Sequence, residues 1–399
     1  MNAPLSKKLN EVKWGEFKIG DLFEKQNLKF KKGKFDKEKD VSRILTEEYS
    51  LPLVNAKDGD NGIMYYGRPE DFENVEMSID IVNDGAVSTG NVYSQPQKTG
   101  VLYNAYLIKS KFELNSSQLH FFTTTIQKSI KLKFSYELKA SWERVKEEFI
   151  QLPEKNDGNI DFDFMEAFIR ELEEERIREL AAYLKVSGFD NYKLSKCESF
   201  ALAHFNELKW KEFNLENLYG KSTRGKRLKS ADRIKGDLPF VTAGEADTGI
   251  SAYIGNEVEI FSKNTTTIDM FGSAKYRNYD YGADDHVAVV HTEKLPKHAA
   301  VFVTAAVHKA SHTGKFDYSN NFYASDADEL NIMLPVTPDD SPDYAFMETF
   351  ISAVQKLVIK DVVLYADKKI AATKQAVHKN PSDYKTPEGF GALKVAEHN

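Results

Sequence analysis

The chain has 399 residues, 41% of them hydrophobic, which is enough for two or three globular domains with cores of their own. Its only cysteine, Cys197, excludes a disulfide framework and a cysteine-rich zinc site, and it favours a reducing, cytoplasmic compartment. No apolar run approaches the roughly 18 residues that a membrane span needs. The net charge of -7 excludes a uniformly basic surface, but it is compatible with local basic segments.

A repeated framework divides the chain into two similar halves. Three blocks recur in the same order: Lys13–Phe17 with Leu22-Phe23 recur as Lys209–Phe213 with Leu218-Tyr219, Leu51–Ile63 as Leu238–Ile250, and Ile150–Ile169 as Ile332–Ile351. Half of the positions in the third block are identical, and short deletions shift the spacing between the blocks. A repeat of this length indicates the duplication of a structural unit.

Each half begins with short alternating segments of apolar and polar residues, broken by Gly, Asn and Asp. Gly62–Gly67 and Gly249–Gly255 are examples, and this pattern predicts short strands joined by turns. After the Leu-Pro of the third block the period of the apolar residues becomes helical. We therefore predict an α+β fold of two tandem β-rich domains, each followed by a long helix. The expected parts are a first domain over 1–160, a first helix over 161–186, a connector over 187–205, a second domain over 206–342, a second helix over 343–377 and a C-terminal tail over 378–399.

Both predicted helices carry apolar residues at helical spacing, and Asp161 and Asp343 stand where an N-cap residue is expected. At about 1.5 Å per residue the helices would be ~40–50 Å long, so each would extend past its own domain. We expect the two helices to pair as an antiparallel coiled coil that separates the domains, although packing of each helix on its own core also fits the pattern. The apolar helix positions expected to contact the other helix or a partner protein are Phe168, Leu172, Leu180, Phe350, Val354 and Leu357.

Basic residues gather at the same place in both halves, directly after the first repeated block. They are Lys29, Lys31, Lys32 and Lys34 in the first half, and Arg224, Lys226, Arg227 and Lys229 in the second. Such clusters neutralise phosphates and release counterions, so they supply salt-sensitive affinity for nucleic acid. A solvated charged loop is the alternative, and the recurrence at matched positions favours DNA binding. Further candidates for contacts with the DNA backbone and base edges are Lys57, Tyr65, Tyr66, Asn91, Lys139 and Arg144 in the first half, and Tyr253, Lys275, Tyr276 and Arg277 in the second.

Catalytic patterns are incomplete in this sequence. Gly220–Lys226 resembles the start of a phosphate-binding loop, but Arg227 stands where a Ser or Thr must bind magnesium. His286 and His291 lie near two aspartates, but their spacing on an apparent strand places them on opposite faces. The residues that recur in both halves are packing and turn residues, whereas two active sites would share polar side chains. We therefore expect neither metal nor cofactor in this chain, and no catalysis by it.

Taken together, the repeated blocks resemble the specificity subunits of type I restriction-modification systems and the related subunits of type IIB systems. The resemblance covers residues 12–377 and rests on Trp14–Phe17, Leu51–Val54, Gly85–Gly90 and Ile150–Glu166, with their counterparts in the second half. It implies two target-recognition domains that bind double-stranded DNA at an asymmetric, bipartite site. The second half departs from the first after Gly272, where a short tyrosine-rich segment stands, so the two domains are expected to make different contacts.

The resemblance also implies partners. Methyltransferase subunits, or a fused methyltransferase-nuclease subunit, would bind S-adenosylmethionine and modify the DNA that this chain selects. Two other functions stay compatible with the sequence. One is a metal-dependent nuclease or nucleotide hydrolase that uses the Asp and His residues near His286; the other is a duplicated carbohydrate- or peptide-binding module, since tyrosine-rich β surfaces suit sugars. A steep loss of DNA binding with salt would distinguish a DNA-binding protein from the second alternative.

Overall fold

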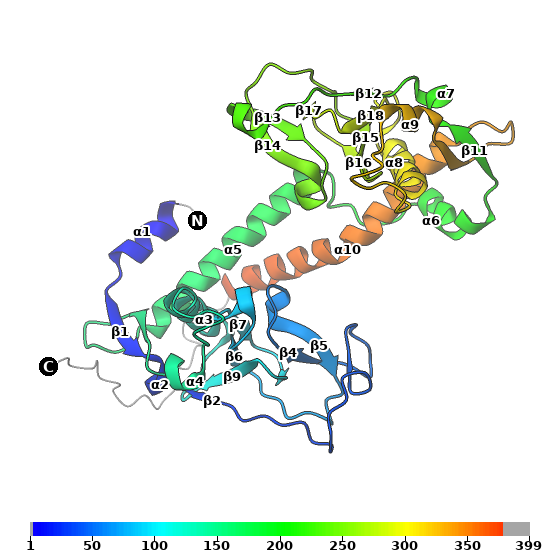
Figure 1. Cartoon of the computed structure of the whole chain (residues 1–399). Helices are drawn as coiled ribbons and strands as arrows, with labels where there is room; N and C mark the ends of the chain where they lie inside the picture. Colours follow the sequence, from blue (N-terminus) through cyan, green and yellow to red (C-terminus); the bar gives the residue numbers. More distant parts are fainter. Residues whose placement is uncertain (1–2, 378–399) are drawn as a thin grey trace. The chain divides into compact units, whose positions relative to one another are not determined.

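The computed structural model of the protein describes residues 3–377, with side chains over residues 5–371. It divides into two compact units: the first contains the residues up to Leu180 and the end of the last helix from Lys368, and the second contains Ala181–Asp367. Both units combine helices with small sheets, which confirms the predicted α+β fold (Figure 1). The predicted tail over 378–399 lies outside the described residues. Among the helices that are described, none is long and apolar enough to cross a membrane.

The first unit starts with a short helix and ends in a long one. Its elements are α1 (Ala3–Glu11), β1 (Trp14–Lys18), α2 (Ile19–Leu22), β2 (Phe23–Lys25), β3 (Val41–Ser42), β4 (Leu51–Val54), η1 (Asp60–Gly62), β5 (Ile63–Gly67), β6 (Ser78–Val82), η2 (Ala86–Ser88), β7 (Val92–Gln95), β8 (Gly100–Val101), β9 (Ala105–Ser110), α3 (Ser116–Ile130), α4 (Trp142–Val145), β10 (Phe149–Pro153) and α5 (Phe162–Val186). The strands form one sheet of order β2-β9-β6-β7, a second of order β3-β5-β4-β8, and a ribbon of β1 with β10.

The second unit repeats this plan. Its elements are α6 (Lys196–Ala203), η3 (Phe205–Glu207), β11 (Trp210–Asn214), α7 (Leu215–Tyr219), β12 (Thr223–Arg224), η4 (Ser230–Asp232), β13 (Lys235–Val241), η5 (Ala246–Gly249), β14 (Ile250–Ile254), β15 (Thr265–Asp269), β16 (Ala274–Arg277), β17 (Gly282–Ala283), β18 (Val287–Val290), α8 (Lys297–Ser311), α9 (Ala324–Glu329), β19 (Asn331–Pro335) and α10 (Tyr344–Val377). Its sheets have the orders β12-β18-β15-β16 and β14-β13-β17, and β11 pairs with β19.

The repeated sequence blocks meet in space within each unit. The first and third blocks form the antiparallel ribbon, in which Trp14 pairs with Pro153 in one unit and Trp210 pairs with Pro335 in the other. The identical register means that the two ribbons correspond residue by residue. The duplication inferred from the sequence is therefore a duplication of structure.

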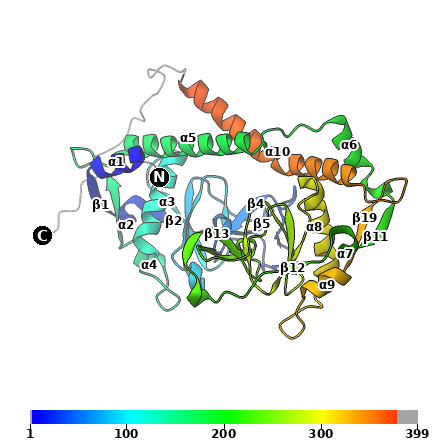
Figure 2. The ribbon, with the colours of Figure 1, turned by 90° about the horizontal axis from the view of Figure 1, so that it is seen from above.

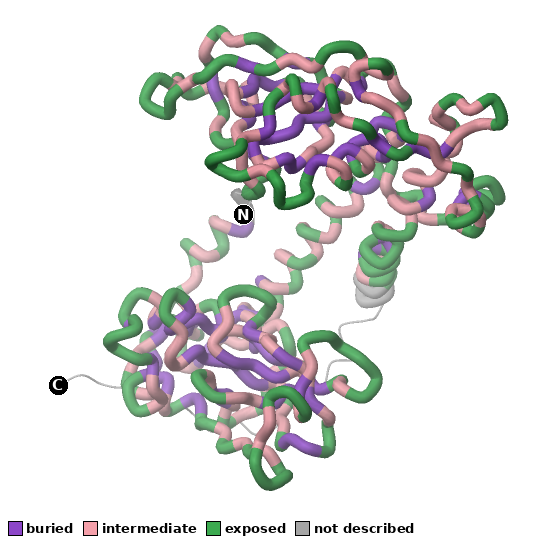
Figure 3. Tube along the Cα trace, turned by 45° about the vertical axis from the view of Figure 1, so that its right-hand side comes forward, coloured by how far each residue is buried: buried purple, intermediate pink, exposed green. Residues whose placement is uncertain are grey.

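In each unit buried residues gather in the interior and exposed ones in the outer loops (Figure 3), and the strands β6 and β15 are among the most buried elements. All five residues of β6 and all five of β15 are buried. In each sheet alternate residues of the strand face opposite sides. The β6 residues Ile79 and Ile81 belong to the same hydrophobic core as Phe122 of α3, whereas Ser78 and Asp80 lie on the other face of the strand. The central strand is thus covered on both faces.

The two long helices that the sequence predicts are α5 and α10. Each begins after its aspartate as predicted, because the Asp161 carboxylate accepts a hydrogen bond from the Phe164 N–H at 3.0 Å and Asp343 accepts one from the Phe346 N–H at 2.9 Å. Near its end, α10 contacts α5 through an ion pair between Lys369 and Glu173. Antiparallel pairing along the whole length of the helices stays a prediction.

In each unit a 15-residue helix leads away from the long helix, α3 from α5 and α8 from α10 (Figure 2). The first turn of α3 is fastened to α5 by a hydrogen bond from Asn115 to Glu166, and α8 to α10 by one from the Ala299 N–H to Glu348. At about 1.5 Å per residue, each helix carries its C-terminal end roughly 20 Å from its start. The loops that follow α3 and α8 therefore lie at the far end of each unit from its long helix.

Candidate nucleic-acid interface

The predicted basic segment of the second unit follows the edge strand β12 and is exposed. Within the described part of the chain, no ion pair involves Arg224, Lys226, Arg227 or Lys229. The segment is held at its base: the Leu228 N–H donates to the Asp284 carboxylate at 3.2 Å. An anchored loop that carries several unpaired cations is a surface suited to a polyanion.

The corresponding segment of the first unit follows β2, the equivalent edge strand. Its lysines differ in their surroundings. Lys29, Lys31 and Lys34 are exposed, whereas Lys32 forms a 2.6 Å ion pair with the buried Asp71 and lowers the pKa of that carboxyl through its hydrogen bond. Phe30 lies between these lysines and packs at 4.9 Å on Phe72. Three of the four predicted lysines are therefore available to a ligand.

Four other predicted contact residues carry intramolecular partners. Lys57 pairs with Asp60 at 2.6 Å, Lys139 with Asp84 at 2.5 Å, and Lys275 with Glu245 at 3.2 Å and with Asp269 at 3.4 Å. The fourth, Arg144, is exposed and donates to the Lys139 carbonyl at 3.0 Å. Exposed pairs of this kind contribute little to stability, so a phosphate could compete for Lys57 and Lys139. The Lys275 side chain is only 11% exposed, and it links Glu245 to Asp269 within the second unit.

The predicted aromatic and amide contacts divide into exposed and buried groups. Tyr253 is 57% exposed, whereas Tyr66 and Tyr276 are half-buried. Tyr65 and Asn91 are each only 5% exposed, and Asn91 donates to Asp58 at 2.8 Å. Little of either side chain is accessible to a ligand, and direct contact of Tyr65 and Asn91 with DNA stays a prediction.

Arg277 has a structural role within the second unit. It is 1% exposed, and its guanidinium donates to the Thr267 hydroxyl at 2.9 Å, to the Tyr279 hydroxyl at 3.0 Å and to the Thr248 carbonyl at 2.8 Å. Thr248 lies in η5 with φ 55°, a backbone region that β-branched residues rarely adopt. In the structure this side chain holds the strained η5 turn from inside, and contact of Arg277 with DNA stays a prediction.

A buried carboxyl group occupies the equivalent layer of the first unit. Asp80 is fully buried in β6, beside Gly62, and neither of its oxygens has a hydrogen-bond partner among the described residues. Burial raises the pKa of the Asp80 carboxyl well above its ordinary value. The strand register places Thr267 of β15 at the position equivalent to Asp80. One unit therefore has an ionisable carboxyl group where the other has a neutral hydroxyl.

A turn that the sequence analysis missed recurs after α3 and α8. Its sequence is Lys133-Phe134-Ser135-Tyr136 in the first unit and Lys315-Phe316-Asp317-Tyr318 in the second. In both copies the third residue donates its N–H to the carbonyl three residues on, at 2.9 and 3.0 Å, and its side chain accepts from that residue's N–H, at 3.2 and 2.9 Å. The two copies of this pattern are separated by the same number of residues as the two copies of the third block, so the sequence alone could have revealed them.

These two turns present the same side chain to solvent. Phe134 is buried and Phe316 packs against the second unit's core, so each phenylalanine anchors its turn. Tyr136 is 68% exposed and Tyr318 is 85% exposed. Exposure of a large aromatic ring to water is unfavourable, because its apolar surface stays solvated. The recurrence of such a ring at one position in two diverged units therefore indicates that both rings make the same kind of contact.

The Asp and His residues near His286, which the nuclease alternative would use, come together without His291. Asp284, Asp285 and His286 offer ligand atoms within 4.8 Å of one another, but one oxygen of Asp284 already accepts the Leu228 N–H. His291 faces elsewhere, with Nε2 at 3.0 Å from the Thr223 hydroxyl. Asp284, Asp285 and His286 are half-buried, and the first unit has no histidine at the matching position.

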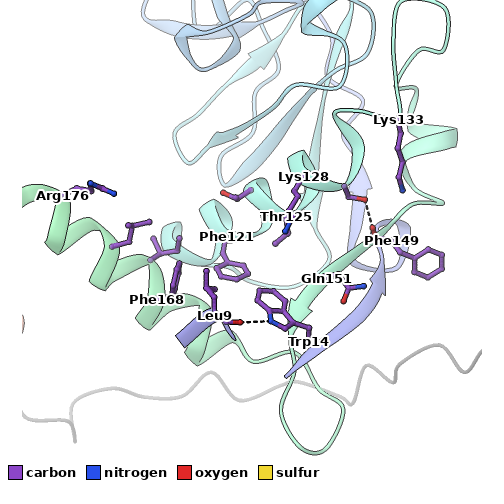
Figure 4. Close-up of a pocket in the computed structure, with 14 residues that line it drawn as sticks. Leu9, Trp14, Phe121, Thr125, Lys128, Lys133, Phe149, Gln151, Phe168 and Arg176 are labelled. Atoms are coloured by element: carbon purple, nitrogen blue, oxygen red, sulfur yellow. Dashed lines mark hydrogen bonds between the residues drawn. The ribbon is translucent and has the colours of Figure 1, made fainter. Parts of the chain in front are cut away.

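The apolar helix residues predicted to bind a partner fall into two groups. Phe168 and Leu172 of α5 line an apolar groove of the first unit (Figure 4), and Phe350 of α10 lines a groove of the second. Leu180 and Val354 are half-buried, and Leu357 is 48% exposed. Phe168, Leu172 and Phe350 thus pack against the cores of their own units and also line grooves on the surface.

Known proteins with a similar sequence or fold are specificity subunits of restriction-modification systems. The model of the type I restriction modification DNA specificity domain matches the chain twice, over residues 11–182 and 207–364. The type II restriction enzyme specificity subunit S.BcgI from Heyndrickxia coagulans is 25% identical over 365 residues, which cover 88% of this chain and 97% of that protein. The crystal structure of a type I restriction-modification system S subunit from M. genitalium has a TM-score of 0.54 at 16% identity, and the match covers 92% of this chain and 94% of that one.

Proposed function

This chain belongs to the family of type I restriction modification DNA specificity domains, and we propose that it selects one asymmetric, bipartite site in double-stranded DNA for partner enzymes. Each unit would bind one half of the site. The partners would be methyltransferase subunits, or a fused methyltransferase-nuclease subunit, that carry S-adenosylmethionine and act where this chain directs them. The chain itself would contribute recognition and no catalysis.

One observation carries the proposal. Two units that share the four-stranded sheet and the ribbon display different polar side chains at equivalent positions, while both keep an exposed tyrosine on the same turn. The exposed loop after β4, Lys57–Asp60, corresponds to Gly244–Asp247 after β13. Base-specific contacts require different donors and acceptors for different half-sites, whereas contacts that position the duplex can be common to both.

The same difference in polar side chains supports a non-catalytic role. A duplicated enzyme would keep matching polar groups at two active sites. Here, the register of β6 with β7 matches that of β15 with β16, so Asp80 is equivalent to Thr267, Tyr93 to Lys275, and Gln95 to Arg277. None of these pairs is the same residue, although the surrounding framework is shared.

Selection from random duplex DNA tests the proposal. The chain, assembled with the methyltransferase subunit of its own system, is expected to enrich one split motif whose two halves differ. Addition of Mg²⁺ to the chain without partners should leave DNA intact. A chain that enriches no motif, or that cleaves DNA alone, would contradict the proposal and favour the nuclease alternative.

A further inference from the structure

Two exposed cations of the first unit meet over one buried tyrosine ring. Tyr65 of β5 is 5% exposed and belongs to the same hydrophobic core as Val41 and Leu53. The Lys37 Nζ lies 5.2 Å from the centroid of the Tyr65 ring, and the guanidinium carbon of Arg43 lies 5.9 Å from it. Both distances are within the range of cation–π contacts, so the ring holds the two cations at one place on the surface.

The backbone around Lys37 is fixed by a turn whose acidic residues are engaged elsewhere. The Asp36 N–H donates to the Asp40 carboxylate at 2.7 Å, and the Asp40 N–H donates to the Asp36 carbonyl at 2.9 Å. Asp36 also pairs with Lys39 at 3.4 Å, and Asp40 pairs with Arg68 at 3.9 Å. The turn therefore holds Lys37 in place without neutralising its charge.

Arg43 is positioned by the strand that precedes it. In β3, Ser42 pairs with Tyr66 of β5, and continuation of this register brings Arg43 to the level of Tyr65. The Ser42 hydroxyl donates to the Ile44 carbonyl at 2.8 Å and accepts from the Ile44 N–H at 3.0 Å. The backbone is thus held on both sides of Arg43, although its side chain is exposed.

The two cations have no carboxylate partner. Within residues 5–371, no acidic side chain forms an ion pair with Lys37 or Arg43. A hydrogen bond with Tyr65 raises the pKa of Lys37, whereas the nearby charge of Arg43 lowers it, as like charges do. Two cations that share one tyrosine and lack a counter-ion leave a positive charge that an anion would neutralise.

The second unit has an alanine where the first has Tyr65. Leu53 pairs with Tyr65 in the first unit, and Phe240 pairs with Ala252 in the second, so the register makes these pairs equivalent. The cation near this place in the second unit is Arg233, whose guanidinium carbon lies 5.1 Å from the centroid of the Phe240 ring. The paired cations are thus a feature by which the first unit differs from the second.

We propose that Lys37 and Arg43 clamp one phosphate group of the DNA backbone in the half-site that the first unit binds, with Tyr65 as the positioning residue that brings them together. This inference rests on the proposed function, because it names a phosphate contact of the DNA which that function requires. The nonbridging oxygens of a phosphodiester accept hydrogen bonds, and both an ammonium and a guanidinium group bind them well. Because the clamp is built in one unit, the backbone contacts of the two half-sites are unequal.

Removal of one DNA charge at a time locates the phosphate. The full chain, assembled with its methyltransferase subunit, is bound to duplexes that carry a neutral methylphosphonate at single positions of the selected site. One position in one half-site should weaken wild-type binding about tenfold through the clamp. The Lys37→Gln/Arg43→Gln double variant should bind the unmodified duplex about tenfold more weakly, with a salt slope lower by about 1, and should lose its sensitivity at that position alone.

Two further variants separate the clamp from general effects of charge and packing. Lys39→Gln is the matched control, because Lys39 is exposed in the same turn and already pairs with Asp36. It should leave the affinity and the methylphosphonate profile unchanged. Tyr65→Phe keeps the buried ring and removes the hydroxyl, so it should weaken binding about threefold while the salt slope, which depends on the two cations, is retained.

Other results would overturn the inference in distinguishable ways. Equal affinity, salt slope and methylphosphonate profile in wild type and the double variant would remove the clamp, and continued selection of one split motif would leave the proposed function intact. Inorganic phosphate is also titrated into the chain alone by calorimetry. Tight binding that the double variant abolishes, with no sensitive methylphosphonate position, would assign the site to a free phosphate compound instead of DNA. A wild-type assembly without preference for any duplex would remove the proposed function itself.

Discussion

Gln95 and Arg277 hold equivalent strained turns in the two units. The Gln95 amide donates to the Asn61 carbonyl at 2.7 Å, and the Arg277 guanidinium donates to the Thr248 carbonyl at 2.8 Å. Asn61 and Thr248 both have positive φ, at 53° and 55°. Each side chain comes from the last residue of its strand, β7 or β16. A common backbone conformation is thus supported by two chemically different side chains.

Replacement of Arg277 by Ala should destabilise the second unit by about 3–5 kcal/mol, because the change leaves buried acceptors unpaired and creates a cavity. Gln95→Ala is the matched change in the first unit and should cost less, about 1–3 kcal/mol, since one amide is removed from a comparable site. Hydrogen exchange of the full chain assigns each destabilisation to its unit. Equal protection in wild type and Arg277→Ala would show that the turn does not depend on this side chain.

Asp80 should make the stability of the first unit depend on pH. Burial raises its folded pKa above the unfolded value of 3.8, so the folded state keeps a proton that the unfolded state loses. Its favourable contribution is complete below pH 3.8 and is lost as pH rises toward the folded pKa. Asp80→Asn removes this pH dependence. The unfolding free energy of the variant minus that of wild type should therefore increase with pH, at up to about 1.4 kcal/mol per pH unit.

The measurement is urea unfolding of both proteins at a series of pH values from 4 to 8, followed by hydrogen exchange in the first unit. Thr267→Val in the equivalent layer of the second unit serves as a control, because it has no titratable group and should give a difference independent of pH. A constant difference for Asp80→Asn as well would mean that the carboxyl is solvated in the folded state.

Tyr136→Ala and Tyr318→Ala should weaken DNA binding while leaving the fold intact. Both rings are largely exposed, so their removal costs little packing, whereas a ring that contacts the duplex contributes about 1–3 kcal/mol. We expect roughly tenfold weaker binding for each variant, and near wild-type binding for the Phe variants. Tyr183→Ala, at an exposed tyrosine of α5, is the control. Unchanged affinity in both alanine variants would exclude the turns from the interface.

The basic segment of the second unit should determine part of the salt dependence of DNA binding. Substitution of Arg224, Lys226, Arg227 and Lys229 by Ala should lower the slope of log affinity against log salt by about 1 for each phosphate that the segment no longer neutralises. Lys32→Ala is an informative comparison, because Lys32 pairs with the buried Asp71. That change should destabilise the first unit and leave the salt slope nearly unchanged. An unaltered slope in the fourfold variant would leave the segment as a solvated loop.

Framework features of this protein could be predicted from its sequence because they depend on local rules. The helical period after each Leu-Pro, the N-cap aspartates and the duplicated blocks each reflect one element or its immediate partner. The repeat showed that the blocks with Trp14 and Trp210 recur, but their pairing with prolines more than a hundred residues away came from the structure.

The contact surface was harder to predict, since burial of a polar residue depends on the tertiary fold. Arg277 and Asn91 have the side-chain chemistry of base contacts, yet both are buried and bonded to loop residues about 30 positions earlier, Thr248 and Asp58. Lys32 and Lys139 are basic residues with acidic partners that are remote in sequence. Tyr136 and Tyr318 were not predicted, because the repeat there is only four residues long.

Whether this chain selects the DNA site is tested most directly by sequencing the methylated bases in cells that carry this gene with its methyltransferase partner. We expect one split motif that vanishes when the gene is deleted. Substitution of the exposed loop Gly244–Asp247 by that of a related chain should then alter one half of the motif and leave the other unchanged. A methylation pattern that is the same with and without the gene would contradict the assignment of this chain as the component that selects the site.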